Sequence, residues 1–223
     1  MTSEMPFGGI YDAPTAARYL MAGRMSEEAY PVKSRTLIRW IRSGVSTRSL
    51  ASVHGRELIF DFEDLVSLRV LAALRSYGVS WPKIAVAEDW LRRETGYERP
   101  FAREEMWTSQ SEVLARFGGR IIAASRHGQY AMEMMLQYLI PINGLRFVNR
   151  VADQWEPRPL IVLDPEVQFG EPCIKGTRIP VRSVWGMSRA GDPDALVMRA
   201  YGLSDSELSA ALEWGDSVAT AAA

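Results

Sequence analysis

The chain has 223 residues, of which 47% are hydrophobic and 24% charged, and its formal net charge is −1. This composition is ordinary for a globular protein of one or two domains. No apolar run approaches the roughly 18 residues needed to span a bilayer, so we expect no membrane partner. Residues 1–10 lack a basic stretch followed by an apolar core, so we expect no signal peptide.

The few cysteines and histidines limit the possible chemistry. Cys173 is the only cysteine, which excludes an intramolecular disulfide and favours a cytoplasmic location. His54 and His127 are the only histidines, and no spacing of ligands indicates zinc. We therefore predict no metal site and no cofactor.

Positive charge is concentrated in one window of the sequence. Residues 29–56 contain six basic and no acidic residues, whereas residues 158–223 contain six basic and nine acidic residues. A basic window in a neutral chain is typical of a DNA-binding element, and a solvated basic face is the alternative.

Two helices are predicted in the first part of the chain. Asp12 can cap a short helix, and Pro14 is tolerated in its first turn. A second helix is expected from Lys33 to Ser43, ended by Gly44.

The second predicted helix has two distinct faces. At 100° per residue its apolar side chains fall on one side, and Arg35, Arg39 and Arg42 fall within an arc of about 60° on the other. Guanidinium groups suit the base edges and phosphates of a major groove. An ordinary amphipathic helix is the alternative, but the absence of acidic residues on the basic face favours DNA.

A hairpin and two further helices follow. Residues 53–60 have strand propensity around Gly55 and predict a β-hairpin with Arg48, His54 and Arg56 near its tip. Asp61 is expected to cap a third helix that reaches Tyr77. A fourth helix is expected from Ser80 to about Thr95.

The order of these elements over residues 8–95 resembles the MerR-type winged helix-turn-helix. The resemblance is carried by the Arg-rich helix, the hairpin, residues 60–65 and residues 78–84. It implies that the second helix enters the major groove and that the hairpin, or wing, flanks it. The sequence departs from the family at residues 21–32, which exceed the usual tight turn, and it has no long dimerisation helix after the fourth helix. The predicted DNA-contacting residues are Lys33, Ser34, Arg35, Thr36, Arg39, Arg42, Arg48, His54 and Arg56.

The middle segment, residues 101–157, predicts a small α+β region. A turn and strand are expected near residues 118–122, a Met-rich helix at 129–138, and a strand at 145–148. The Met and aromatic residues could line a small-molecule pocket. No convergent polar groups accompany them, which favours an ordinary core.

The C-terminal part predicts a short buried strand at residues 160–163, a tight loop and three helices. We refer to residues 170–181, which contain two prolines and the sequence Gly176-Thr177-Arg178, as the Gly-Thr-Arg loop. The first helix is expected at about residues 182–189. The second should be capped by Asp192, and the third should run from a capping box at Ser204 to Trp214.

These residues resemble a widespread small bacterial domain that was long called only a domain of unknown function. The resemblance covers about residues 158–216 and is carried by Asp164-Pro165, the Gly-Thr-Arg loop, Gly191-Asp192 and residues 201–211. It implies a VapB-type antitoxin, whose partner is a PIN-domain ribonuclease toxin. Lys175, Arg178 or Arg182 could reach the Mg²⁺-binding carboxylates of such a toxin. The alternative is that the loop serves only the fold.

Taken together, the sequence predicts a mainly α fold with small β elements. Residues 1–100 would form a MerR-like winged helix-turn-helix, residues 101–157 a small α+β segment, and residues 158–223 a strand with a homeodomain-like three-helix bundle. The expected function is a dimeric, cytoplasmic, non-catalytic antitoxin that binds promoter DNA and a PIN-domain toxin. Its half-sites would lie about one helical turn apart, or a multiple of that. An effector-sensing MerR-like regulator is the first alternative, and an enzyme is a weak second because no catalytic motif is present.

Overall fold

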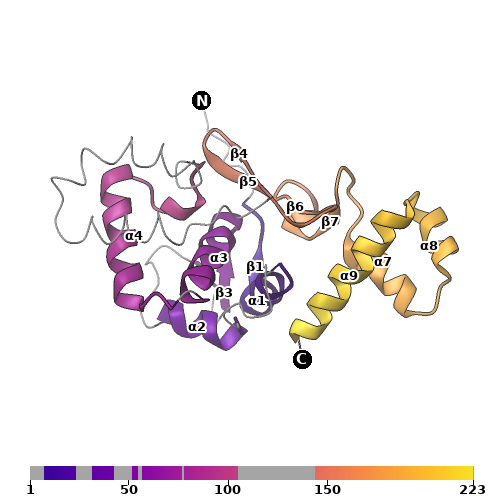
Figure 1. The fold of residues 1–223 in the computed structure, drawn as a ribbon, viewed down its shortest axis with the longest axis horizontal. Coiled ribbons are helices and arrows are strands. Elements are labelled where there is room, and N and C mark those ends of the chain that lie inside the picture. Colours follow the sequence, from indigo (N-terminus) through magenta and orange to yellow (C-terminus); the bar gives the residue numbers. More distant parts are fainter. Residues whose placement is uncertain are drawn as a thin grey trace.

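The computed structural model describes residues 8–23, 32–42, 52–54, 57–76, 78–104 and 144–222, with backbone alone at residues 52–54, 57 and 94. As predicted, the fold is mainly helical with small antiparallel sheets (Figure 1). Among the described residues, no helix is both long and apolar enough to cross a membrane.

The first hundred residues form the predicted helices and hairpin, with bounds that differ by one or two residues from those expected. The elements are β1 (Tyr11–Asp12), α1 (Ala13–Ala22), α2 (Ser34–Arg42), β2 (Ser52–His54), β3 (Glu57–Phe60), α3 (Phe62–Ser76), α4 (Trp81–Thr95) and the 3-10 turn η1 (Pro100–Ala102). Gly44, Arg48, Gly55 and Arg56 lie outside the described residues.

Side-chain caps fix the starts of α1 and α3 where the sequence predicted them. The backbone N–H of Thr15 donates to Oδ1 of Asp12 at 2.7 Å. At α3, the N–H of Asp64 donates to Asp61 at 2.8 Å, and the N–H of Asp61 donates back to Asp64 at 3.1 Å. Each contact satisfies an N–H that the first helical turn leaves without a partner.

A three-stranded antiparallel sheet of order β1-β3-β2 holds the hairpin against the helices. Tyr11 pairs with Phe60, and His54 pairs with Glu57 at the end of the hairpin. The predicted hairpin is therefore confirmed in its backbone pairing. Its anchor on β1 was not predicted, because two residues are too short a strand to leave a pattern.

The second half begins with a four-stranded antiparallel sheet of order β4-β5-β6-β7. It is formed by β4 (Leu145–Val148), β5 (Val151–Arg158), β6 (Ile161–Leu163) and β7 (Cys173–Ile174), with the 3-10 turn η3 (Gln168–Gly170) between the last two. The strands at 145–148 and 160–163 were predicted and β5 was not. The expected boundary at residue 157 lies within β5. The strand and helix expected between residues 118 and 138 lie outside the described residues.

Three helices complete the chain as predicted: α7 (Val181–Arg189), α8 (Asp194–Tyr201) and α9 (Asp205–Ala222). The capping box at α9 is present, since the N–H of Ser204 donates to Oε2 of Glu207 at 2.8 Å. Two details were wrong. Pro193 rather than Asp192 precedes α8 as its N-cap, and α9 continues eight residues past Trp214.

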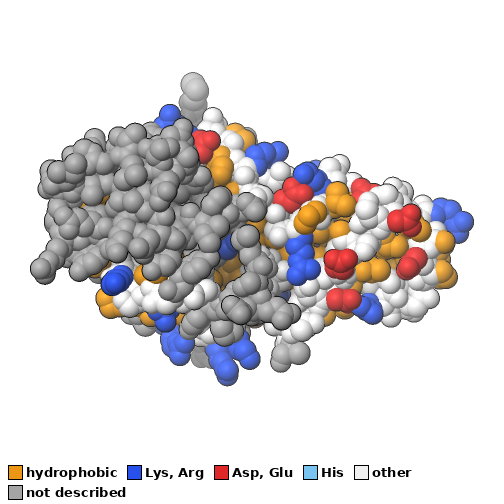
Figure 2. Space-filling model, in the orientation of Figure 1, with side chains coloured by type: hydrophobic (Ala, Val, Ile, Leu, Met, Phe, Trp, Pro, Cys, Tyr) orange, Lys and Arg blue, Asp and Glu red, His pale blue; other side chains and the backbone are white. Residues whose placement is uncertain are grey.

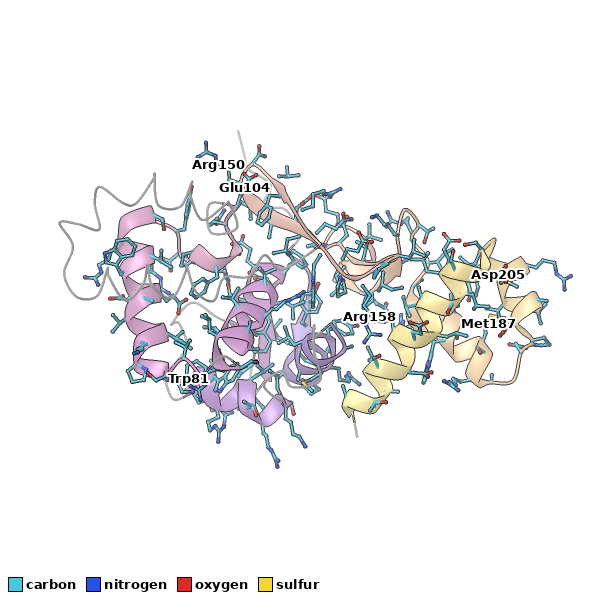
Figure 3. All side chains as sticks on the ribbon, viewed as in Figure 1. Trp81, Glu104, Arg150, Arg158, Met187 and Asp205 are labelled. Atoms are coloured by element: carbon cyan, nitrogen blue, oxygen red, sulfur yellow. The ribbon has the colours of Figure 1, made fainter. Side chains whose placement is uncertain are left out.

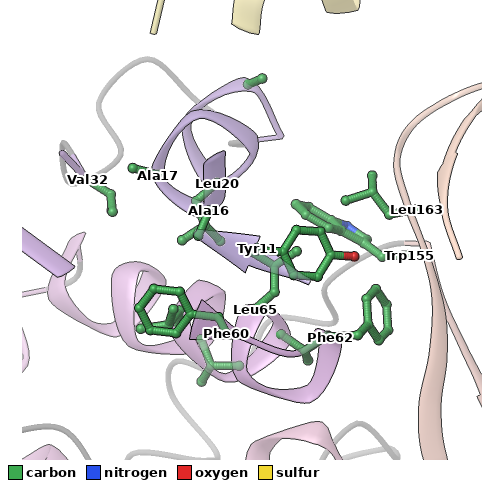
Figure 4. Close-up of a cluster of buried hydrophobic side chains, with 14 of the residues drawn as sticks. Tyr11, Ala16, Ala17, Leu20, Val32, Phe60, Phe62, Leu65, Trp155 and Leu163 are labelled. Atoms are coloured by element: carbon green, nitrogen blue, oxygen red, sulfur yellow. The ribbon is translucent and has the colours of Figure 1, made fainter. Parts of the chain in front are cut away.

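One hydrophobic core connects the two halves of the molecule (Figure 4). Tyr11 and Phe62 from the first half lie beside Trp155 and Leu163 from the four-stranded sheet, and Trp155 is only 1% exposed. The hydroxyl of Tyr11 donates to the carbonyl of Gly170 at 3.0 Å. The C-terminal elements are therefore packed onto the helices that support α2.

Candidate nucleic-acid and protein interfaces

The inward face of α2 anchors this helix in the core. Thr36, Leu37 and Trp40 are buried, at 9%, 0% and 2% exposure. The ring of Trp40 meets Trp81 of α4 edge-on, with centroids 4.7 Å apart. Figure 3 labels Trp81 at the N-terminal end of α4. Thr36 was predicted to contact DNA, but it lies on this buried face. The anchored face fixes the direction in which the opposite face points.

The outward face of α2 carries the predicted arginines. Arg35, Arg39 and Arg42 are exposed, as is Lys33 just before the helix, while Ser34 is half-buried. Figure 2 shows a group of blue side chains at the lower edge of the molecule, where Figure 1 places α2. None of the three arginines forms an ion pair within the described part of the chain. Together they form a positively charged face that can attract an anion.

Other arginines in the first half differ from those of α2 because carboxylates engage them. Nε of Arg99 lies 2.6 Å from Asp64 and its NH2 lies 2.9 Å from Asp61. Arg93 lies 3.1 Å from Asp89 on α4. Burial is the largest effect on the Asp64 carboxyl and raises its pKa to about 6, with Asp61 adding to the rise and Arg99 opposing it. This network ties the start of α3 to the turn after α4.

His54, another residue predicted to contact DNA, lies on the β2–β3 hairpin. The backbone of His54 ends β2, opposite Glu57. Arg48 and Arg56 lie outside the described residues, so their predicted contacts stay predictions.

The Gly-Thr-Arg loop is held by its own hydrogen bonds. Oγ1 of Thr177 donates to the carbonyl of Ile174 at 2.8 Å and accepts from the N–H of Ile179 at 3.1 Å. Gly176 has a φ of 76°, a conformation that favours glycine. Gly176 and Thr177 therefore account for the sharp turn and place Arg178 at the surface.

The three basic residues expected to contact a toxin lie in different environments. Nζ of Lys175 lies 2.6 Å from Glu156, and Nε of Arg182 lies 2.5 Å from Glu171. Arg178 is exposed, and within the described ranges its guanidinium makes no ion pair. Of these three residues, only Arg178 can therefore pair with a carboxylate of a partner without first breaking an internal ion pair.

A hollow of about 450 Å³ lies beside this loop. Its lining includes Arg178 and Thr177 together with Gln154 and Asp164, which were not predicted as site residues. Cys173 also lines it, and burial raises the pKa of its thiol to about 11. The thiol is therefore protonated at neutral pH and is a poor nucleophile or metal ligand. The side chains described here contain no group of three His, Cys, Asp or Glu residues placed to hold a metal.

Comparison with known proteins finds relatives of the whole chain and of its C-terminal part. Residues 161–214, from β6 into α9, match a family model described as "Protein of unknown function (DUF433)". The Mycobacterium tuberculosis H37Rv protein "Putative antitoxin VapB45" is 27% identical over 235 residues, covering 92% of each chain. The crystal structure of Rv2018 from the same species aligns with a TM-score of 0.66 and 26% identity, covering 94% of this chain and 98% of that one. The chain is thus similar along nearly its whole length to a protein described as a "putative antitoxin".

Proposed function

We propose that this protein is an antitoxin that represses its own operon through α2 and neutralises a ribonuclease toxin through its C-terminal half. The observation that carries the DNA-binding part is the row of three exposed arginines on the outer face of α2, none of which has an ion-pair partner among the described residues. The similarity to VapB45 supports the antitoxin part.

The DNA-binding surface would consist of α2 as the recognition helix and the β2–β3 hairpin as the wing, in the manner of a winged helix-turn-helix. A helix of this width fits the major groove of B-DNA, where arginine can pair with guanine edges or phosphates. Within the described residues no carboxylate forms an ion pair with the α2 guanidinium groups, whereas the carboxylates at the start of α3 are engaged by Arg99 and Arg103. Lys33, which is exposed just before the helix, would contact the phosphate backbone, and a dimer would read two half-sites in a palindrome.

The toxin-binding surface is centred on Arg178. A PIN-domain toxin would present clustered carboxylates. The exposed guanidinium of Arg178 would form a bidentate ion pair with one of them. Lys175 and Arg182 would first have to leave Glu156 and Glu171. The acidic balance of residues 158–223 disfavours DNA at this end of the molecule. The role we assign is regulatory rather than catalytic, and its place is the cytoplasm.

A pair of charge-matched variants tests the DNA-binding surface. Replacing Arg35, Arg39 and Arg42 with alanine should weaken binding to the promoter of the operon by more than about 100-fold, and it should reduce the dependence on salt by about three released ions. The control replaces Arg146, Arg189 and Arg199, which removes the same charge from the other half of the molecule. Fluorescence anisotropy at several salt concentrations measures both quantities. Unchanged affinity and salt slope in the α2 variant would refute the DNA-binding assignment.

The toxin partner is tested by co-purification with the product of the adjacent gene. We expect a PIN-domain protein that stays bound to the wild type and to the α2 triple variant, and whose affinity falls in the Arg178→Ala variant. If the product of the adjacent gene does not co-purify, the proposed toxin partner is wrong. If it binds the Arg178→Ala variant as tightly as the wild type, the proposed role of Arg178 is wrong.

A further inference from the structure

A pocket of about 250 Å³ lies where α1 meets the C-terminal helices α7 and α9, on a lining that is distinct from the outer face of α2. Three aromatic side chains contribute to its lining: Tyr19 from α1, Trp185 from α7 and Trp214 from α9. Arg18, Glu171 and Arg182 supply its charged groups. This composition, an apolar cavity with a few charged groups, is typical of a small-molecule site.

The aromatic walls are fixed by contacts within the protein. The rings of Tyr19 and Trp214 lie 6.3 Å apart at 43°. Nε1 of Trp185 donates to Oδ1 of Asp216 at 2.8 Å. The Trp185 ring also lies directly on Gly215, where even a Cβ atom would collide with it. Gly215 inside α9 is therefore explained by this contact, which holds Trp185 in place at the pocket.

Among the charged groups of the pocket lining, Arg18 has no ion-pair partner in the described part of the chain. Arg182 is paired with Glu171 at 2.5 Å, so these two groups compensate each other. The NH2 group of Arg18 donates a hydrogen bond to Oγ1 of Thr15 at 3.2 Å, and its buried Nε has no hydrogen-bond partner among the described residues. Arg18 makes no ion pair with any carboxylate of the described residues. An anion in the pocket would therefore meet a guanidinium group whose charge no described carboxylate compensates.

Tyr19 adds a possible polar contact. Burial raises the pKa of its hydroxyl, and the neighbouring Glu171 carboxylate adds to the rise. The phenol is therefore protonated at neutral pH and can donate a hydrogen bond.

We propose that this pocket binds a small aromatic monoanion, with its ring between the aromatic walls and its carboxylate on Arg18. The size is suitable, because a cavity of about 150 Å³ holds a single benzene ring and this one is larger. A ligand here would touch α1, which packs on α2, and also α7 and α9. It would lie at the junction between the proposed DNA-binding helices and the C-terminal bundle.

Calorimetric titration of the full chain with three naphthalene compounds tests the proposal. The probes are 2-naphthoate, 2-naphthylmethanol and 2-naphthylmethylamine, which share a ring system and are anionic, neutral and cationic. We expect 2-naphthoate to bind at least about tenfold more tightly than the other two, because a charge-assisted hydrogen bond to Arg18 forms only with the anion. Equal affinity for all three, or no binding of the naphthoate, would overturn the proposal.

Variants locate the site. Arg18→Met should weaken 2-naphthoate binding by about tenfold while leaving the neutral probe unchanged. Ala219→Leu fills the pocket from an exposed position on α9 and should abolish binding of both. Arg199→Met, which removes an exposed arginine of α8 outside the pocket lining, is the matched control. Circular dichroism checks folding, and if Arg18→Met does not fold, Ala219→Leu decides. Binding that survives Ala219→Leu would place the naphthoate elsewhere and refute the site.

Discussion

The α2 helix and the Gly-Thr-Arg loop region each carry three basic side chains that the sequence predicts to bind a partner. The two sets differ in the ion pairs that they form within the protein. Arg35, Arg39 and Arg42 are exposed and unpaired among the described residues. Lys175 and Arg182 are held by Glu156 and Glu171.

The difference lies in where the carboxylates come from. Glu156 lies on β5 and is brought to Lys175 by the pairing of the four-stranded sheet. The α2 arginines have no such carboxylate within the described part of the chain, and the carboxylates at the start of α3 pair instead with Arg99 and Arg103. A basic residue is therefore available to a partner only where the fold brings no acid to it, and a sequence window alone does not show this. The following predictions use this contrast between free and engaged groups.

The largest expected effect comes from the buried face of α2. Replacing Trp40 with alanine removes a core side chain and its contact with Trp81, and should lower the free energy of unfolding by about 3–5 kcal/mol. Urea unfolding followed by circular dichroism measures the change. The Arg35→Ala variant on the opposite face is the control and should unfold within about 0.5 kcal/mol of the wild type. A Trp40→Ala protein as stable as this control would show that α2 is not anchored as described.

Next in size is the effect of a single outward-facing residue on DNA binding. Arg39→Ala should weaken promoter binding by about 1–3 kcal/mol and relax the preference for one base pair if Arg39 contacts a base. Arg199→Ala, on α8, removes the same charge far from α2 in sequence and should have no effect. Binding to a set of single-base operator variants measures both the affinity and the specificity. A uniform loss across all variants would instead assign Arg39 to a phosphate.

The comparison also shows how far the sequence determines the structure. The starts of α1 and α9 were predicted from local sequence, because Asp12 and Ser204 make the hydrogen bonds that their spacing implies. The basic face of α2 was equally predictable from the helical period. These features depend on residues within one turn of each other.

Features that depend on distant residues were missed. The end of α9 was predicted at Trp214, but the Trp185 ring packs on Gly215 and the helix continues beyond it. The strand β5 was missed because Pro157 lies in it and its apolar residues do not alternate regularly. The partners of Lys175 and Arg182 could not be predicted, since sheet pairing and loop closure bring them together.

A buried carboxylate should make stability depend on pH. Glu88 on α4 is 3% exposed, and burial raises the pKa of its carboxyl from 4.5 to about 7, against the effect of Arg92 at 3.5 Å. Because the folded-state pKa is the higher one, the contribution to stability is complete below pH 4.5 and is lost as the pH rises through 7. The free energy of unfolding should therefore fall by about 2 kcal/mol between pH 5 and pH 8 on account of this group.

Glu88→Gln is the comparison that isolates this group. The variant keeps the size of the side chain but cannot ionise, so it should be more stable than the wild type at pH 8 and nearly equal to it at pH 5. Urea unfolding at both values gives the difference, in which the raised pKa of Asp64 cancels because Asp64 is present in both proteins. Parallel pH profiles for the two proteins would mean that Glu88 is not desolvated.

The smallest effect is expected at Thr177, where the loop is held by local hydrogen bonds rather than by a distant acid. Thr177→Val keeps the shape of the side chain but removes the oxygen that contacts Ile174 and Ile179, which should cost about 1 kcal/mol of stability. Thr177→Ser keeps the oxygen and should cost less. Promoter affinity should be unchanged in both, because the loop lies in the C-terminal half. If the valine variant instead lost toxin binding without any loss of stability, Thr177 would contact the toxin directly and the loop would not serve merely to present Arg178.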